Sequence, residues 1–206
     1  MALFFAHIDF ARRQINFDDR FLGSPNLNAQ VYFSLDGVDC PIAEPRRPID
    51  PAFYSHKLRR AALRYEVGVP LFGNRIVWVN GGVPAGAHPD LVLARQLVVQ
   101  LLNPGEKVVA DSGYRDPAVF INKILRPRTD TEKQYNTWIR RVLARHETVN
   151  ARLKNFNVLR SAFHHGATAV ARAALHQQCF MACANLTQMM LQRGNALMAP
   201  VELPNF

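Results

Sequence analysis

Three acidic side chains lie where they could support a metal-dependent reaction. Asp36 and Asp111 each follow a short apolar stretch predicted to be a strand, and a glycine comes one or two residues after each. Strand ends are common sites of chemistry in α/β folds, and glycine lets the backbone approach a ligand closely. Glu147 lies in a long helical pattern. Carboxylates bind hard cations such as Mg²⁺, and two such ions can activate a water and stabilise the leaving oxygen of a phosphodiester.

Each acid taken alone also fits a solvated turn or helix face. On a helix, Glu147 lies between Arg140 and Lys154 at intervals of seven residues, so the three nearly superpose. The apolar stripe of that helix comprises Trp138, Val142, Val149, Leu153 and Phe156. Glu147 faces away from this stripe, which fits an acid facing a cleft between two bases and equally fits an exposed, salt-bridging face.

The elements that must position these acids can be read from periodicity and turn residues. We expect strands at 31–35, 107–110 and 119–126, a hairpin across 63–79 that turns at Gly73-Asn74, a loop at 81–86, and helices at 90–102, 131–156 and 167–192. Asp90 is the expected N-cap of the first helix. This order of elements predicts a mixed α/β domain with a central sheet.

Charge points to a polyanionic partner. The 206 residues include 25 Lys and Arg against 16 Asp and Glu, a net charge of +9. Such a surplus favours nucleic acid, although a basic protein without such a partner stays an alternative. Three cysteines are too few for a disulfide framework and favour a reducing compartment. The N-terminus lacks the pattern of a signal peptide, and no apolar run reaches the ~18 residues of a membrane span.

Four segments, taken in order, resemble a known family. SLDGVDCPI, VNGGVPAGAHPDLVLAR, GEKVVADSGYRDP and ARHETVNARLKNFNVLR are together similar to the DDE-type transposase domain of the PIF/Harbinger group and its domesticated relatives, over roughly residues 30–195. The family's Asp-Gly begins here at Asp36, and its Asp-x-Gly-Tyr begins at Asp111. Its helical Glu, seven residues before a Lys, is matched by Glu147 and Lys154.

The resemblance implies an RNase H-like fold, a mixed sheet flanked by helices with a C-terminal helical extension. The expected division is a lead segment at 1–30, a DDE endonuclease domain at 31–195 and a tail at 196–206. It implies that Asp36, Asp111 and Glu147 hold two Mg²⁺ or Mn²⁺ ions for hydrolysis or strand transfer at DNA phosphodiesters.

Further residues follow from the same resemblance. Arg140, Arg152 and Lys154 are expected to contact DNA phosphates. His88 and Asp90 match the family's Gly-x-x-His-Asp segment, with Pro89 inserted between them, and are expected to be accessory site residues.

The chain departs from the family in two places. Val38 stands where the family usually has Thr, and Asp39 offers a second carboxylate beside Asp36, so Asp36 is the preferred ligand and Asp39 is the alternative. About 30 residues precede the first strand, too few for the family's N-terminal helix-turn-helix region. We therefore expect a separate DNA-binding partner protein or a truncated copy. A homo-oligomer is a further expectation, as is a nuclear location, with the cytoplasm as a second compartment.

Two alternatives remain from the sequence. The first is a domesticated, catalytically inactive module that binds DNA or a protein through the same basic surface. The second concerns His176, Cys179 and Cys183, whose helical spacing could face a zinc ion. Because no fourth ligand is evident, packing in a helical core is the preferred interpretation for these three.

Overall fold

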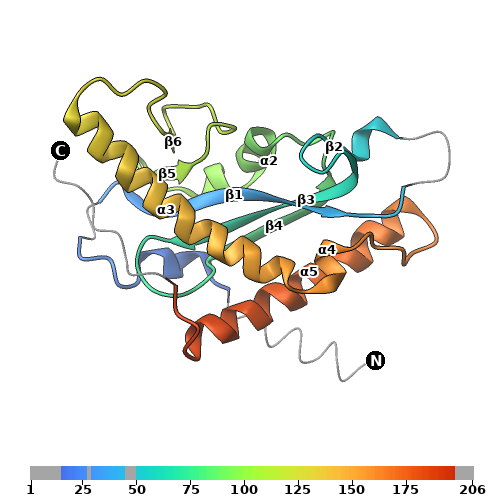
Figure 1. Cartoon of the computed structure of the whole chain (residues 1–206). Coiled ribbons are helices and arrows are strands. Elements are labelled where there is room, and N and C mark those ends of the chain that lie inside the picture. Colours follow the sequence, from blue (N-terminus) through green and yellow to red (C-terminus); the bar gives the residue numbers. More distant parts are fainter. Residues whose placement is uncertain (1–14, 27–28, 45–49, 198–206) are drawn as a thin grey trace.

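The fold is built on one open, twisted sheet with helices on both faces (Figure 1). The computed structural model describes residues 15–26, 29–44 and 50–197. The strands are β1 (Val31–Pro41), β2 (Tyr54–Ser55), β3 (Arg60–Pro70), β4 (Trp78–Pro84), β5 (Lys107–Ala110) and β6 (Phe120–Ile121). The helices are α2 (Asp90–Gln96), α3 (Asp130–Lys154), α4 (Asn157–Arg160) and α5 (Ala169–Gln192), with 3₁₀ turns η1 (Phe17–Phe21), η2 (Pro51–Phe53) and η3 (Val98–Leu101).

The sheet order is β2-β3-β1-β5-β6, with β4 also paired to β3. β1 and β3 are antiparallel, whereas β1, β5 and β6 run parallel. This mixed sheet with flanking helices confirms the predicted α/β, RNase H-like fold. Most of the expected lead segment and most of the expected tail, residues 1–14 and 198–206, lie outside the described residues.

Alternation along β1 divides its side chains between two layers. Val38 and Cys40 pack with the inner face of α3 and with α5, while Phe33 and Leu35 pack in the cluster that contains α2. Because side chains of a strand alternate between faces, Asp36 shares the α3 face with Val38. The sheet therefore presents this carboxylate to α3.

Several predicted boundaries were wrong, each for a physical reason. β1 continues past residue 35 to Pro41 because β3 pairs with it along that length. The second hairpin strand comes later than predicted and includes the expected loop at 81–86 as far as Pro84. Gly81 has a φ of 118° and lies at an irregularity opposite Tyr65, which an alternating pattern cannot reveal. The first helix ends at Gln96 and continues as a 3₁₀ turn.

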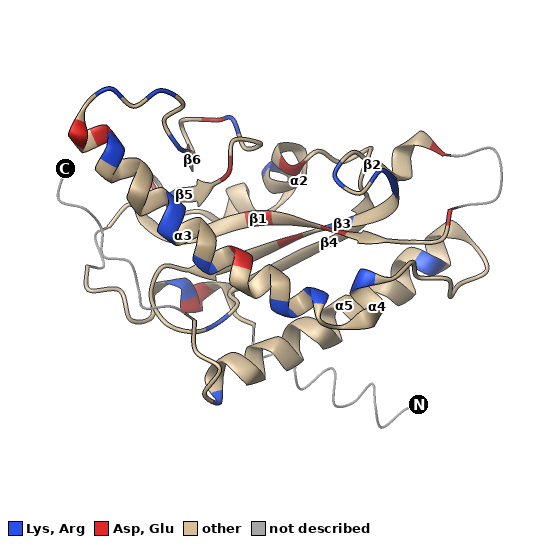
Figure 2. Cartoon of the chain, viewed as in Figure 1, with Lys and Arg blue, Asp and Glu red and all other residues tan. Residues whose placement is uncertain are grey.

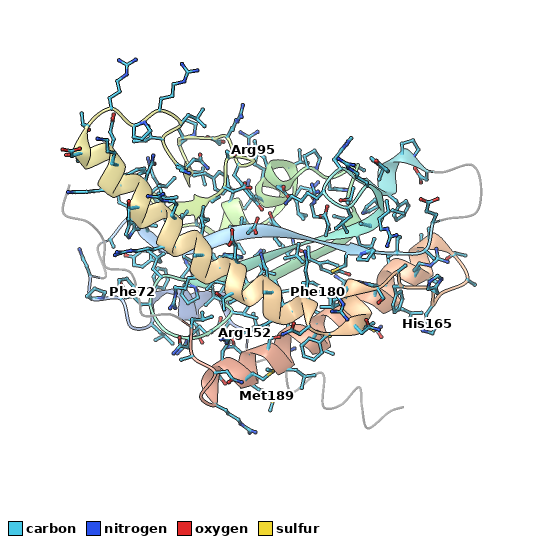
Figure 3. The ribbon with its side chains drawn as sticks, viewed as in Figure 1. Phe72, Arg95, Arg152, His165, Phe180 and Met189 are labelled. Atoms are coloured by element: carbon cyan, nitrogen blue, oxygen red, sulfur yellow. The ribbon has the colours of Figure 1, made fainter. Side chains whose placement is uncertain are left out.

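α5 is attached to the sheet through aromatic and imidazole contacts. The Phe180 ring, labelled in Figure 3, stacks on the Tyr65 ring with centroids 3.8 Å apart. The Tyr65 hydroxyl is hydrogen-bonded to His176 Nδ1 at 2.7 Å. Cys183 lies in the same core. Figure 2 shows that α5 is uncoloured between its ends, because no Lys, Arg, Asp or Glu occurs from Ala173 to Gln192. None of the described helices is long and apolar enough to cross a bilayer.

His146 on α3 makes folding stability depend on pH. Its Nδ1 is hydrogen-bonded to the Ser34 hydroxyl at 2.8 Å, and burial lowers its pKa from 6.5 to about 3. Between these two values the unfolded chain binds a proton that the folded chain does not, so this histidine lowers the free energy of unfolding as the pH falls below 6.5. We expect His146→Gln to show a smaller drop in the free energy of unfolding, measured with urea, between pH 7 and pH 5. Equal drops in the parent and the variant would contradict this.

Candidate active site

Parallel pairing of two strands brings the two aspartates together. Leu35 on β1 pairs with Ala110, the last residue of β5, so Asp36 and Asp111 are the next residue on each strand. β5 ends at Ala110 while β1 continues to Pro41, so β1 has no β5 partner from Asp36 onward. This pairing places the two residues next to each other in the sheet. It corrects the view that Asp36 ends its strand.

Asp36 is held from two sides. The backbone N–H of Gly37 donates to its Oδ1 at 2.8 Å, and the side-chain amide of Asn150 on α3 donates to its Oδ2 at 2.9 Å. Burial raises the pKa of Asp36, and the charge of Asp111 raises it further, whereas Lys57 and Lys154 lower it. A carboxylate with these neighbours is one that a bound cation would stabilise in its charged form.

Asp111 sits in the turn that follows β5. Its Oδ1 accepts the Gly113 N–H at 2.8 Å, and its main-chain carbonyl accepts the Asn122 side-chain amide at 2.6 Å. One side-chain oxygen therefore fixes the Asp-x-Gly turn. Asn122 joins the start of that turn to the segment after β6.

The third predicted acid is placed differently from the two aspartates. Glu147 is exposed on α3, and the α3 side chain that contacts Asp36 is Asn150, one turn later. Within residues 15–26, 29–44 and 50–197, no three His, Cys, Asp or Glu side chains are grouped closely enough to hold a metal ion. The convergence of Glu147 with Asp36 and Asp111 thus stays a prediction.

Asn150 is a residue that the sequence reasoning missed. Its Oδ1 is buried and has no hydrogen-bond partner within the described residues, while its amide nitrogen binds Asp36. A buried amide oxygen without a partner is uncommon and is a ligand type that hard cations accept. The available signal was spacing, because Asn150 precedes Lys154 by four residues and shares its helix face. Carboxylate and amide oxygens, the donor types present here, are those that suit a hard divalent cation.

The other carboxylate on β1 is on the opposite face of the sheet. Asp39 is 3% exposed and accepts two hydrogen bonds from Arg64, at 2.8 and 2.9 Å, and one from the Ser55 hydroxyl at 2.5 Å. Although burial acts to raise the pKa of Asp39, the hydrogen bonds from Arg64 and Ser55 hold it below its ordinary value. Asp39 is therefore engaged by Arg64 and Ser55 on the face away from α3, which favours Asp36, the preferred ligand of the two.

Asp90 packs against β1 beside Gly37 and supports the site there. It is the first residue of α2 and not its N-cap, a position held by Pro89 without a side-chain hydrogen bond. Its carboxylate lies 3.2 Å from Arg64 Nε and 3.5 Å from Lys57 Nζ. It rests against Gly37, where an ideal Cβ would be 2.1 Å from its Oδ1. Burial raises the pKa of Asp90, with Asp36 among the smaller causes.

His88 serves the same support through its backbone. Its main-chain carbonyl accepts from Arg64 Nη1 at 3.1 Å. Its ring Nδ1 donates to the Pro84 carbonyl at 3.2 Å. The expected accessory pair thus lies behind β1, joined to Asp39 by Arg64.

We expect Gly37→Ala to destabilise the fold by about 1–3 kcal/mol, because the new methyl group overlaps Asp90. Combining it with Asp90→Ala removes the overlapping atoms. The double variant should therefore be less destabilised than the sum of the two single variants, as measured by urea unfolding. Simple additivity would show that Asp90 does not occupy the space beside Gly37.

The basic residues predicted to touch DNA have different surroundings. Arg140 is exposed and donates to Thr137 Oγ1 at 2.9 Å. Arg152 is labelled in Figure 3 and donates to the carbonyls of Asn195 and Ala196. Lys154 is exposed, and its charge acts on Asp36. DNA contact by these three stays a prediction.

Comparison with known protein families agrees with this geometry. The family model described as DDE superfamily endonuclease matches residues 35–188, most of the chain, from the strand that carries Asp36 into the last turns of α5. The chain belongs to the DDE superfamily endonucleases. Searches among curated proteins and among solved structures find no match.

Membership in the DDE superfamily endonucleases suggests a transposase-like nuclease that acts on DNA. Members of this superfamily generally use divalent metals. The matched range contains Asp36, Asp111, Glu147 and the supporting Asp90. The acids on the sheet and the acids on the helices therefore all lie within the superfamily domain.

Proposed function

We propose that the chain is a divalent-metal-dependent DNA endonuclease that hydrolyses phosphodiesters or transfers strands. The observation that carries the proposal is the parallel pairing of β1 with β5, which sets Asp36 and Asp111 side by side in a DDE superfamily domain. Asp36, Asp111 and Glu147 are the proposed catalytic acids and metal ligands, with Asn150 beside them.

The position of each residue suggests its role in the reaction. Asp36 is fixed within the sheet, so it offers a carboxylate oxygen at one place, while Asp111 offers its carboxylate from the adjacent turn. These oxygens would hold Mg²⁺ or Mn²⁺, which would supply activation of a water or 3′-hydroxyl and charge stabilisation of the leaving oxygen. Lys154, together with Arg140, would hold DNA phosphates along α3. Asn150 keeps Asp36 turned toward α3.

The direct test is nicking of supercoiled plasmid by the purified chain with Mg²⁺, with Mn²⁺ and with EDTA, beside Asp111→Asn. We expect nicking that requires the metal and is lost in the variant. The Asp116→Asn variant is a matched control, because Asp116 is paired with Arg95 in an exposed ion pair. Absence of nicking under all conditions, with salt-sensitive retention of DNA, would favour the catalytically inactive binding module.

The finer assignments belong to the same proposal. The order of motifs supports the PIF/Harbinger group within the superfamily, and this resemblance together with a proposed DNA substrate supports a nuclear location. A separate DNA-binding protein and self-association are proposed partners. Co-purification of the chain from nuclear extract on a DNA fragment of defined sequence would identify the DNA-binding partner and any second copy of the chain. The Asp111→Asn chain is purified in parallel for comparison.

A further inference from the structure

The turn between β2 and β3 carries a cluster of exposed basic side chains. We define this basic turn as residues 55–60; it includes Lys57, Arg59 and Arg60, and it is coloured blue beside β2 in Figure 2. Within the described residues, Arg59 and Arg60 have no ion-pair partner. These two guanidinium groups are therefore available to an anion from outside.

The basic turn is firmly anchored. Ser55 is fully buried, and its hydroxyl donates to Asp39 and accepts the Leu58 N–H at 3.1 Å. The Arg59 N–H donates to the Ser55 carbonyl at 2.7 Å. Arg59 has a φ of 54°, and among the described residues it is the one non-glycine with positive φ. This left-handed conformation is held by the bonds around it, as is common where a loop has a fixed task.

The basic turn borders the acids. Lys57 Nζ donates to the Gly37 carbonyl at 3.4 Å and lies 3.5 Å from Asp90. Of the charges that act on Asp36, Lys57 is the strongest, and it lowers the pKa of that carboxyl. The Lys57 side chain is 45% exposed, so a phosphate can reach its ammonium group from solvent. Lys154, on α3, acts on Asp36 as well.

We infer that the basic turn binds the phosphate backbone of the nucleic acid and guides a phosphodiester toward Asp36. The inference rests on the proposed function for the identity of the ligand and adds where that ligand lies. Lys57 would bind the phosphate nearest the acids, and Arg59 and Arg60 would bind the next ones. Since Lys57 contacts the Gly37 carbonyl, a phosphate bound to Lys57 would lie beside the segment of β1 that carries Asp36.

The test compares two variants that lose the same charge. Lys57→Gln/Arg59→Gln/Arg60→Gln removes three positive charges from the basic turn, and Lys123→Gln/Arg126→Gln/Arg128→Gln removes three exposed charges before α3. Binding of a fluorescent DNA duplex is measured by anisotropy at several salt concentrations with EDTA present. Each lost phosphate contact lowers the slope of log K against log salt by about 0.9. We expect the first variant to bind at least about tenfold more weakly, with a slope smaller by about 2–3, and the second to change far less.

Equal weakening of the two variants would mean that only net charge matters and would overturn the inference, as would no weakening of either. Lys57→Gln and Lys57→Arg provide a second measurement at an exposed side chain, where the arginine should retain binding. Nicking by the parent chain is scored separately. Nicking without a difference between the two triple variants rejects the inference alone, and a difference without nicking rejects the proposed function alone.

Discussion

Replacing Asp36 by asparagine is expected to lower metal-dependent nicking by about a thousandfold or more while leaving the fold at least as stable as the parent. The lost carboxylate removes metal-centred charge stabilisation worth several kcal/mol, and each 1.36 kcal/mol is a factor of ten in rate. The free energy of unfolding, in contrast, is not expected to fall. Because burial raises the pKa of Asp36, its charged form disfavours folding at neutral pH, and a neutral amide avoids that. The unpartnered Oδ1 of Asn150 can accept from the new amide after a side-chain flip.

Two measurements check this result. Plasmid nicking gives the rate, and urea unfolding at pH 7 gives the free energy of unfolding. A variant that keeps more than a tenth of the parent rate, with the same metal requirement, would exclude Asp36 as a metal ligand. A variant that loses nicking only because it unfolds would leave the rate uninformative, so both measurements are made on the same preparation.

Asp39→Ala is expected to destabilise the fold by about 3–5 kcal/mol, because it leaves the Arg64 guanidinium buried without its bidentate carboxylate. The Ser55 hydroxyl loses its acceptor as well, and the basic turn loses its anchor. This is a large fraction of the stability of an ordinary domain, so the variant should unfold at a much lower urea concentration.

A matched control isolates the effect of burial at Asp39. Asp116 forms a 2.5 Å ion pair with Arg95 on the surface, where such pairs contribute little. Asp116→Ala should therefore unfold close to the parent. If the two variants lost similar stability, the Arg64–Asp39 pair would not be a buried structural pair.

Periodicity predicted the parts of the fold that local sequence controls. The two long helices have their predicted extent to within two residues, and β5 matches its predicted bounds. An amphipathic or apolar run of such a length is compatible with few other secondary structures. β4 was misplaced because it contains a glycine bulge, which reads as a loop until β3 pairs with it. β1 was shortened because Asp36 and Gly37 look like a turn when no partner strand is known.

The sequence predicted two neighbouring acids of the candidate site but neither Asn150 nor the contacts that hold them. Motif order identified Asp36 and Asp111, and the sheet pairs their strands. The hydrogen bond from Asn150 to Asp36 depends on how α3 crosses β1, which no spacing along one helix determines. The position of Lys57 likewise depends on β2 pairing with β3, a two-residue contact that leaves almost no pattern in the sequence.

The buried pair of Asp39 with Arg64 also protects the chemistry during folding. Asp36 and Asp39 lie on the same strand three residues apart and face opposite sides of the sheet. A slip of β1 by an odd number of residues would exchange these faces, turn Asp36 away from α3 and take from the buried Arg64 guanidinium its bidentate partner, leaving it only the contact with Asp90 among the described residues. Since breaking a buried ion pair is among the costlier defects, mispaired chains are disfavoured before any substrate arrives. The Asp39–Arg64 salt bridge thus favours the correct register of β1 against β3.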